Sequence, residues 1–155
     1  MIPIFEVTSV VKQEAAMAHI KHSFQIDLAI EQLVIDFSYS PKIMNDKKRI
    51  DKAFEAYALT YPKEARPALM KDKAGTKQLT NLLTVNVEDP NGFRGNGHRQ
   101  ASVQRIVLSE EAATDGFYRG KIPKGLWTVS ICTHSIVSEE VTYKLKISGI
   151  REGGL

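Results

Sequence analysis

The sequence predicts an all-β protein with two packed antiparallel sheets, a β-sandwich of jelly-roll or Greek-key type. Apolar residues recur at every second position along most of the chain, and clusters of Gly, Pro, Asn and Asp separate these stretches. A parallel α/β core would instead show continuous apolar runs alternating with helices. With 155 residues, 43% of them apolar and 25% charged, the chain can form one domain with its own core.

The alternating stretches follow one another from the start of the chain to near its end. Each is a predicted strand, because a period of two places its apolar residues on one face. Trp127 begins the clearest of them, directly after a Pro-Lys-Gly turn, so we expect its indole to anchor the core. The predicted strands lie at residues 5–11, 18–26, 33–39, 83–87, 103–107, 127–133 and 141–147.

One segment, residues 45–61, has the period of an amphipathic helix instead. Ile50, Phe54, Tyr57 and Tyr61 follow the helical spacing, and Pro62 ends it. The preceding Asn or Asp can cap its first turn.

Residues 63–77 are rich in charge and interrupted by Pro and Gly, so we expect a mobile surface excursion there. We therefore predict one β-sandwich domain over residues 1–149 with a helical insertion at about 45–75. Residues 150–155, which include Gly153 and Gly154, are expected to form a flexible tail or the start of a linker.

Composition excludes several classes of partner. Lys and Arg number 21 against 18 Asp and Glu, and the excess is +2 over residues 1–78 and +1 over 79–155. This even distribution argues against nucleic-acid binding. No apolar run approaches the ~20 residues of a membrane span, and the start lacks the pattern of a signal peptide. With Cys132 as its only cysteine, the chain is expected to be a soluble cytoplasmic protein without membrane attachment.

The residues that could carry catalysis do not form a recognisable constellation. His19 and His22 have a spacing that would join them on a helix, but on a strand their rings point to opposite faces. His134 and Cys132 lie in a strand pattern and are expected to be structural. We therefore predict no catalytic residues, no metal site and no cofactor, and thus no enzymatic activity in this chain.

The glycine-rich segment at residues 89–99 admits two interpretations. Its backbone N–H groups could converge with Arg94, His98 and Arg99 to bind an anionic or polar ligand. Alternatively, it is an inter-strand connection in which Arg94 packs on Phe117 or Trp127 and ties backbone carbonyls together. The sequence favours the second interpretation, because turn chemistry alone explains the glycines.

Five segments, in this order, resemble a known domain. They resemble the β-sandwich that precedes the catalytic domain in CehA/McbA-type metallohydrolases of the PHP superfamily, and the resemblance covers about residues 24–147. It implies an accessory module, with metal binding and hydrolysis located in a following PHP barrel that opens with a His-x-His motif. The present sequence contains no His-x-His, so no catalytic residue is carried over. The five segments are Leu33–Pro41, Asn81–Pro90, Gly92–Gly95, Ala113–Gly120 and Pro123–Val129.

Three functions follow as hypotheses. The first is a non-catalytic accessory or interaction module whose partner is a protein domain. The second is a small-molecule or carbohydrate-binding domain that uses the 89–99 loop with an exposed Tyr39 or Tyr118. The third, a free-standing metal-dependent phosphoesterase, ranks last because metal-ligand spacing is missing. The oligomeric state is left open.

Overall fold

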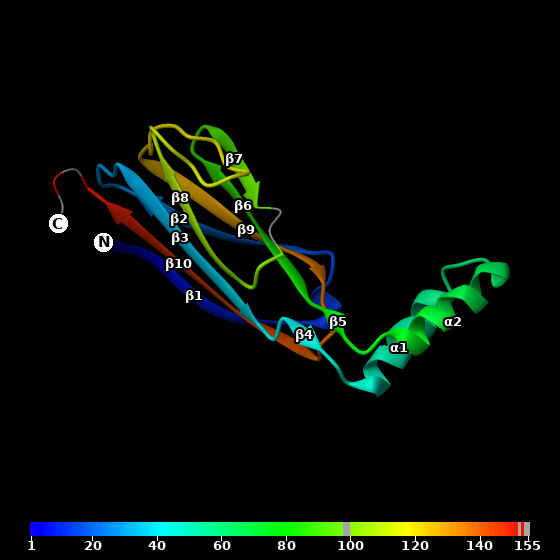
Figure 1. Cartoon of the computed structure of the whole chain (residues 1–155). Coiled ribbons are helices and arrows are strands. Elements are labelled where there is room, and N and C mark those ends of the chain that lie inside the picture. The colour runs from blue at the N-terminus through cyan, green and yellow to red at the C-terminus, as the bar shows by residue number, and fades with distance from the viewer. Residues whose placement is uncertain (98–99, 152, 154–155) are drawn as a thin grey trace.

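The computed structural model describes residues 1–97, 100–151 and 153, and it confirms the all-β fold class. Two four-stranded antiparallel sheets lie face to face (Figure 1). The first sheet has the order β1 (Ile2–Lys12), β10 (Glu140–Ile150), β3 (Gln32–Ser40) and β8 (Val103–Ser109). The second has the order β2 (His19–Ile26), β9 (Gly125–Ser135), β6 (Leu82–Asp89) and β7 (Gly92–Gly97).

The inward-facing residues of both sheets form one core, as the alternating pattern predicts. Trp127 is completely buried, and its indole Nε1 donates a hydrogen bond to the carbonyl of Pro123 at 2.9 Å. The prediction that Trp127 anchors the core is therefore confirmed. Phe37 and Tyr143 of the first sheet belong to the same core, with 6.3 Å between their ring centroids.

The two ends of the described chain lie together. β1 and β10 pair along their whole length, so that Ile2 faces Gly149 in the register. Ile150, which the sequence analysis assigned to the tail, is the last residue of β10. Residues 152, 154 and 155 lie outside the described residues.

The predicted insertion forms an arm that leaves the sandwich between β3 and β6 (Figure 1). We call residues 43–80 the arm. Its root is a two-stranded ribbon of β4 (Ile43–Met44) and β5 (Leu79–Thr80), and its shaft is an antiparallel pair of helices. The helices are α1 (Lys47–Ala58) and α2 (Arg66–Gly75), joined through a short 3₁₀ turn at Lys63–Ala65.

The prediction of α1 is confirmed, with Asp46 as its N-cap accepting from the amide of Arg49 at 3.0 Å. Most of the surface excursion expected at residues 63–77 is the helix α2, which the sequence analysis did not specify. Pro67 lies in the first turn of α2, where its missing N–H would have had no partner in any case. Proline at this position is compatible with a helix rather than a signal against one.

Asn81 ties the root of the arm to the sandwich. Its completely buried side chain donates to the carbonyl of Pro41 and to Oγ of Ser138, at 3.0 and 2.7 Å. Its Oδ1 accepts from the amides of Val137 and Ser138. One amide therefore joins the segment before the arm to the connection between β9 and β10, and every polar atom of its side chain has a partner.

The segment 89–99 differs from the long connection expected from the sequence. β6 ends at Asp89 and β7 begins at Gly92, so a tight hairpin replaces the predicted loop and Gly92–Gly97 is a strand. A bulge between Val87 and Glu88 shifts the register of this hairpin. Alternating apolar side chains are missing from β7, and for this reason the sequence pattern did not reveal it.

Candidate functional site

Arg94 was the central residue of the candidate ligand site, and its guanidinium is engaged within the protein. Its Nε and Nη2 donate to the carbonyls of Tyr118 and Gly120, at 3.0 and 3.1 Å. Its Nη1 donates to the carbonyl of Lys121 at 2.9 Å and to Oδ2 of Asp89 at 3.0 Å. The side chain thus fastens the 118–121 connection to the β6–β7 hairpin.

The surroundings of Arg94 are those of a buried structural ion pair. The side chains of Arg94 and Asp89 are only 8% and 7% exposed, and the guanidinium lies over the indole of Trp127. This is the geometry expected for the second interpretation of the segment. His98 and Arg99, the other two candidate residues, lie outside the described residues. Ligand binding by the three residues together therefore stays a prediction. The guanidinium of Arg94 already donates to acceptors within the protein.

Of the two tyrosines expected beside that site, one is buried. Tyr39 is 4% exposed, and its hydroxyl accepts a hydrogen bond from Nζ of Lys42. Tyr118 is exposed and forms an edge-to-face pair with the equally exposed Phe93, with 6.1 Å between ring centroids. Of the two predicted tyrosines, Tyr118 is thus the exposed one, and it forms a surface pair with Phe93.

Three histidines make contacts that the sequence could not specify. On the outer face of the second sheet, Nδ1 of His19 lies 3.1 Å from Sγ of Cys132. His22 faces inward, with its Nε2 2.7 Å from the hydroxyl oxygen of Tyr143. His134 Nε2 lies 2.7 Å from Oγ1 of Thr84. His19 and His22 thus lie on opposite faces, as predicted from the strand period.

The His19–Cys132 pair has the spacing of a nucleophile and its base, yet its environment opposes that role. Burial raises the pKa of the Cys132 thiol, and a hydrogen bond from Thr84 offsets this only in part. Cys132 is only 4% exposed, which restricts access by a substrate. Reactive cysteines have a lowered pKa and an accessible sulfur, so this thiol is suited to packing. In the described parts of the chain, no three His, Cys, Asp or Glu side chains are arranged to hold a metal ion.

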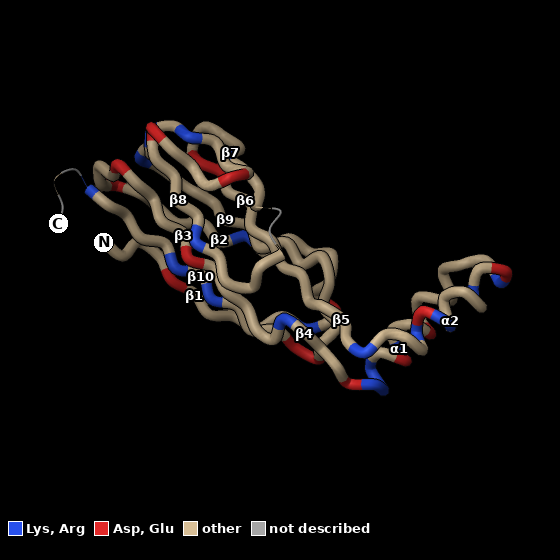
Figure 2. Tube along the Cα trace, viewed as in Figure 1, with Lys and Arg blue, Asp and Glu red and all other residues tan. Residues whose placement is uncertain are grey.

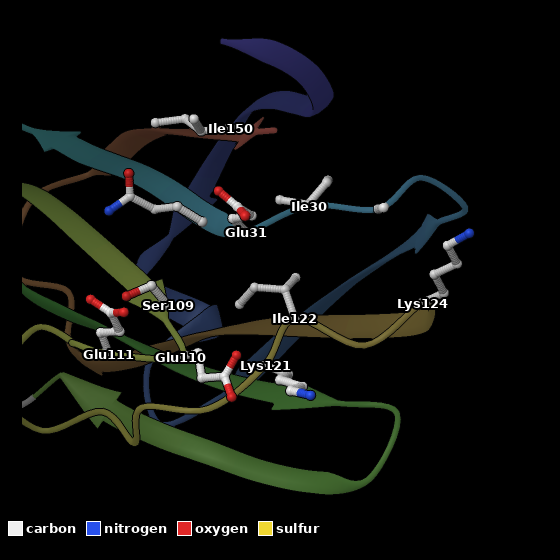
Figure 3. Close-up of a pocket in the computed structure, with 11 residues that line it drawn as sticks. Ile30, Glu31, Ser109, Glu110, Glu111, Lys121, Ile122, Lys124 and Ile150 are labelled. Carbon is white, nitrogen blue, oxygen red and sulfur yellow. The ribbon is translucent and has the colours of Figure 1, made fainter. Parts of the chain in front are cut away.

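A cavity of about 610 Å³ opens at the end of the sandwich opposite the arm. Ile30, Ile122 and Ile150 contribute its apolar part. Figure 3 shows Glu31 approaching from the segment before β3, and Glu110 and Glu111 from the turn after β8. Sequence analysis missed this site, because its charged residues come from two connections far apart in the chain and because adjacent glutamates are typical of solvated turns.

The arm carries the other distinctive surface. Residues 47–77 contain nine Lys and Arg against four Asp and Glu, a net charge of +5. The rest of the chain has 12 against 14, a net charge of −2. Figure 2 shows basic positions at the start of α1 and along both helices. At the far end of the arm, Tyr57 is 52% exposed, Leu59 75% and Tyr61 38%.

A second cavity, of about 600 Å³, lies at the base of the arm helices. It is lined by residues of both helix ends, among them Lys47, Asp51, Lys73 and Lys77. Nζ of Lys73 and Oδ1 of Asp51 form an ion pair at 3.8 Å across this base. The pair links α1 to α2 and leaves the lysines in excess on the surrounding wall.

Two comparisons with known proteins yield no relative. No family model matches the chain, and no curated protein matches it either. In addition, no helix in the described residues combines the length and apolar character needed to cross a membrane. The resemblance to the PHP-associated sandwich therefore stays an expectation, and function must be argued from the surfaces described above.

Proposed function

We propose that this chain is a non-catalytic accessory or interaction module, a β-sandwich that presents the arm to a partner protein. The observation that carries the proposal is the arm itself, a basic two-helix projection on which Tyr57, Leu59 and Tyr61 are exposed. Exposed apolar groups bordered by charge are typical of protein-binding surfaces. The core of the sandwich contains no residue of the arm, which supports a role for the arm outside folding.

The chemistry of the sandwich supports the non-catalytic half of the proposal. Arg94 is engaged by four acceptors, and burial raises the pKa of the Cys132 thiol, its one candidate nucleophile. The resemblance to the domain that precedes a PHP barrel supports an accessory role beside a metal-dependent hydrolase. The lone cysteine, buried and without a disulfide, favours a reducing compartment such as the cytoplasm.

The test is an activity and metal measurement on the full chain. We expect no hydrolysis of p-nitrophenyl phosphate or bis(p-nitrophenyl) phosphate with Mn²⁺, Zn²⁺ or Fe²⁺ added, and no stoichiometric metal after dialysis. Turnover that co-purifies with bound metal would overturn the proposal. Reading the coding sequence beyond Leu155 addresses the accessory role, since continuation into a His-x-His barrel supports it and a stop codon weighs against it.

A second candidate function is binding of a small polar ligand, and the cavity at the end of the sandwich favours it. Three glutamates and two lysines surround its isoleucines, and no ion pair engages any of the five among the described residues. Such a wall suits a ligand with an apolar body and both amino and hydroxyl or carboxylate groups. Amide chemical-shift changes around Ile30 and Ile122 with a panel of amino sugars and amino acids would support it. Changes scattered over the surface would contradict it.

A further inference from the structure

The two helices of the arm bury few of their side chains. Of the residues of α1, only Ile50 and Ala58 are buried, and none of α2 is. Two polar contacts join the helices: Nε of Arg66 donates to the carbonyl of Ala58 at 3.1 Å, and Lys73 pairs with Asp51. Helices of 12 and 10 residues depend on packing for most of their stability, so burial of a further face would stabilise this pair.

Three aromatic residues, two on α1 and one just after its end, form a strip in which Tyr57 and Tyr61 are exposed and Phe54 is partly buried. Phe54, Tyr57 and Tyr61 are spaced by three and four residues, which is the spacing of a ridge on a helix. The two tyrosine rings meet edge to face at 5.0 Å, and the Tyr61 hydroxyl donates to that of Tyr57 at 2.9 Å. A ridge of this kind fits the groove of another helix better than a flat surface.

The positive charge of the arm indicates which kind of partner its aromatic strip binds. The +5 charge of residues 47–77 disfavours pairing of two arms from two copies of the chain, because like charges would be brought together. Nε of Arg49 on α1 is buried and has no hydrogen-bond partner among the described residues, so a carboxylate arriving there would satisfy it.

We propose that the strip of Phe54, Tyr57 and Tyr61 binds an acidic amphipathic helix of a partner protein, which completes a three-helix bundle with α1 and α2. This inference rests on the proposed interaction function and names its partner and its site. Tyr and Arg supply much of the binding energy at protein interfaces, and both occur on α1. The positive charge of the arm accelerates association with an acidic helix and makes it sensitive to salt.

The experiment titrates the full chain with a synthetic Leu/Glu heptad peptide, a helix with an apolar face and a net negative charge. We expect saturable binding at low salt that weakens at least about tenfold in about 0.5 M NaCl. A Tyr57→Ala/Tyr61→Ala variant should bind at least about tenfold more weakly, and Arg49→Gln several-fold more weakly. Tyr118→Ala, which removes an equally exposed tyrosine from the sandwich, is the matched control and should bind as the unaltered chain does.

Hydrogen exchange gives a second readout that does not depend on the variants. Amides of residues 47–75 should exchange rapidly in the free chain and slow down when the peptide is bound, while the sandwich strands remain unchanged. Equal binding of a Leu/Lys peptide, no binding of the acidic peptide, or preference for phosphatidylserine vesicles or a DNA duplex would overturn the inference. If the peptide experiments fail and the chain still shows no phosphoesterase activity, only the assignment of the partner is overturned. The proposal of a non-catalytic module then stands.

Discussion

The guanidinium of Arg94 lies over the indole of Trp127, with 5.5 Å between its central carbon and the ring centroid. Trp127 is fully buried, so the cation lies against the core while its N–H groups donate to carbonyls of the 118–121 connection. A desolvated cation–π contact of this kind adds to the ion pair with Asp89. The polar residue most suggestive of ligand binding is thereby part of the packing of the sandwich.

Replacing Arg94 by Ala should destabilise the fold by about 3 kcal/mol or more, because Asp89 would remain buried without its partner. Urea unfolding monitored by Trp127 fluorescence measures the change. Arg105→Ala serves as the control, since Arg105 forms a two-point ion pair with Asp36 on an exposed surface, where little stability is lost. Equal stability of the two variants would contradict the structural role of Arg94.

Gly95→Ala should be more destabilising than Gly92→Ala, although both glycines have a positive φ. A Cβ at position 95 would lie 2.5 Å from Cα of Phe117, whereas a Cβ at position 92 would have nothing within 4 Å. Position 92 therefore bears backbone strain alone, about 1–2 kcal/mol, and position 95 bears a backbone collision as well. Thermal melting of the two variants gives the comparison, and an equal loss would show that the approach of β7 to Phe117 is unimportant.

Excising the arm should leave the sandwich folded. If residues 45–78 are replaced by a short Gly-Ser linker, we expect a change in unfolding free energy of about 1 kcal/mol or less, since no arm residue belongs to the core cluster. Asn81→Ala in the full chain is the contrasting variant. It removes four buried hydrogen bonds and should cost about 2–4 kcal/mol. Loss of the folded state on excision would mean that the helices are part of the folding unit.

The stability of the chain should fall as the pH drops below neutrality, in part because of His22. Burial lowers the pKa of His22, so the unfolded chain takes up a proton at a higher pH than the folded chain does. Its contribution is complete above about pH 6.5, the ordinary pKa of histidine, and is lost as the pH falls towards the lowered value. His22→Gln keeps a partner for the Tyr143 hydroxyl without titrating, and should show a smaller fall in Tm between about pH 7.5 and 5. Parallel curves for the two proteins would exclude His22 as a source of this pH dependence.

The sequence predicted those features that depend on residues close together in the chain. Alternation located the strands that carry Trp127 and Leu145, and the helical period located α1. The sequence analysis missed α2, because a proline in the first turn of a helix resembles a helix breaker. It also missed β7, because the glycines of this strand leave no alternation of apolar side chains to detect. The pairs Asn81–Ser138 and His19–Cys132 depend on strand order and register, which no local pattern contains.

The charge of the arm was hidden for a similar reason. Residues 1–46 carry three basic and six acidic residues, which offset most of the +5 of residues 47–77 when the first half of the chain is summed. Dividing the sequence at its midpoint therefore gave an even distribution. The boundaries of the folded elements, rather than those of the chain, are the ones at which charge has a meaning for binding.

The antiparallel pairing of β1 with β10 places both chain ends at one extremity of the sandwich, whereas β3 and β6 open onto the arm at the other (Figure 1). Strands of 11 residues such as β10 span roughly 35 Å. Any polypeptide joined at Ile2 or Ile150 would consequently lie at least about this distance from a molecule bound by the arm, which extends beyond the sandwich. The sandwich would act as a rigid spacer of fixed length, because the chain ends and the arm lie at its opposite ends.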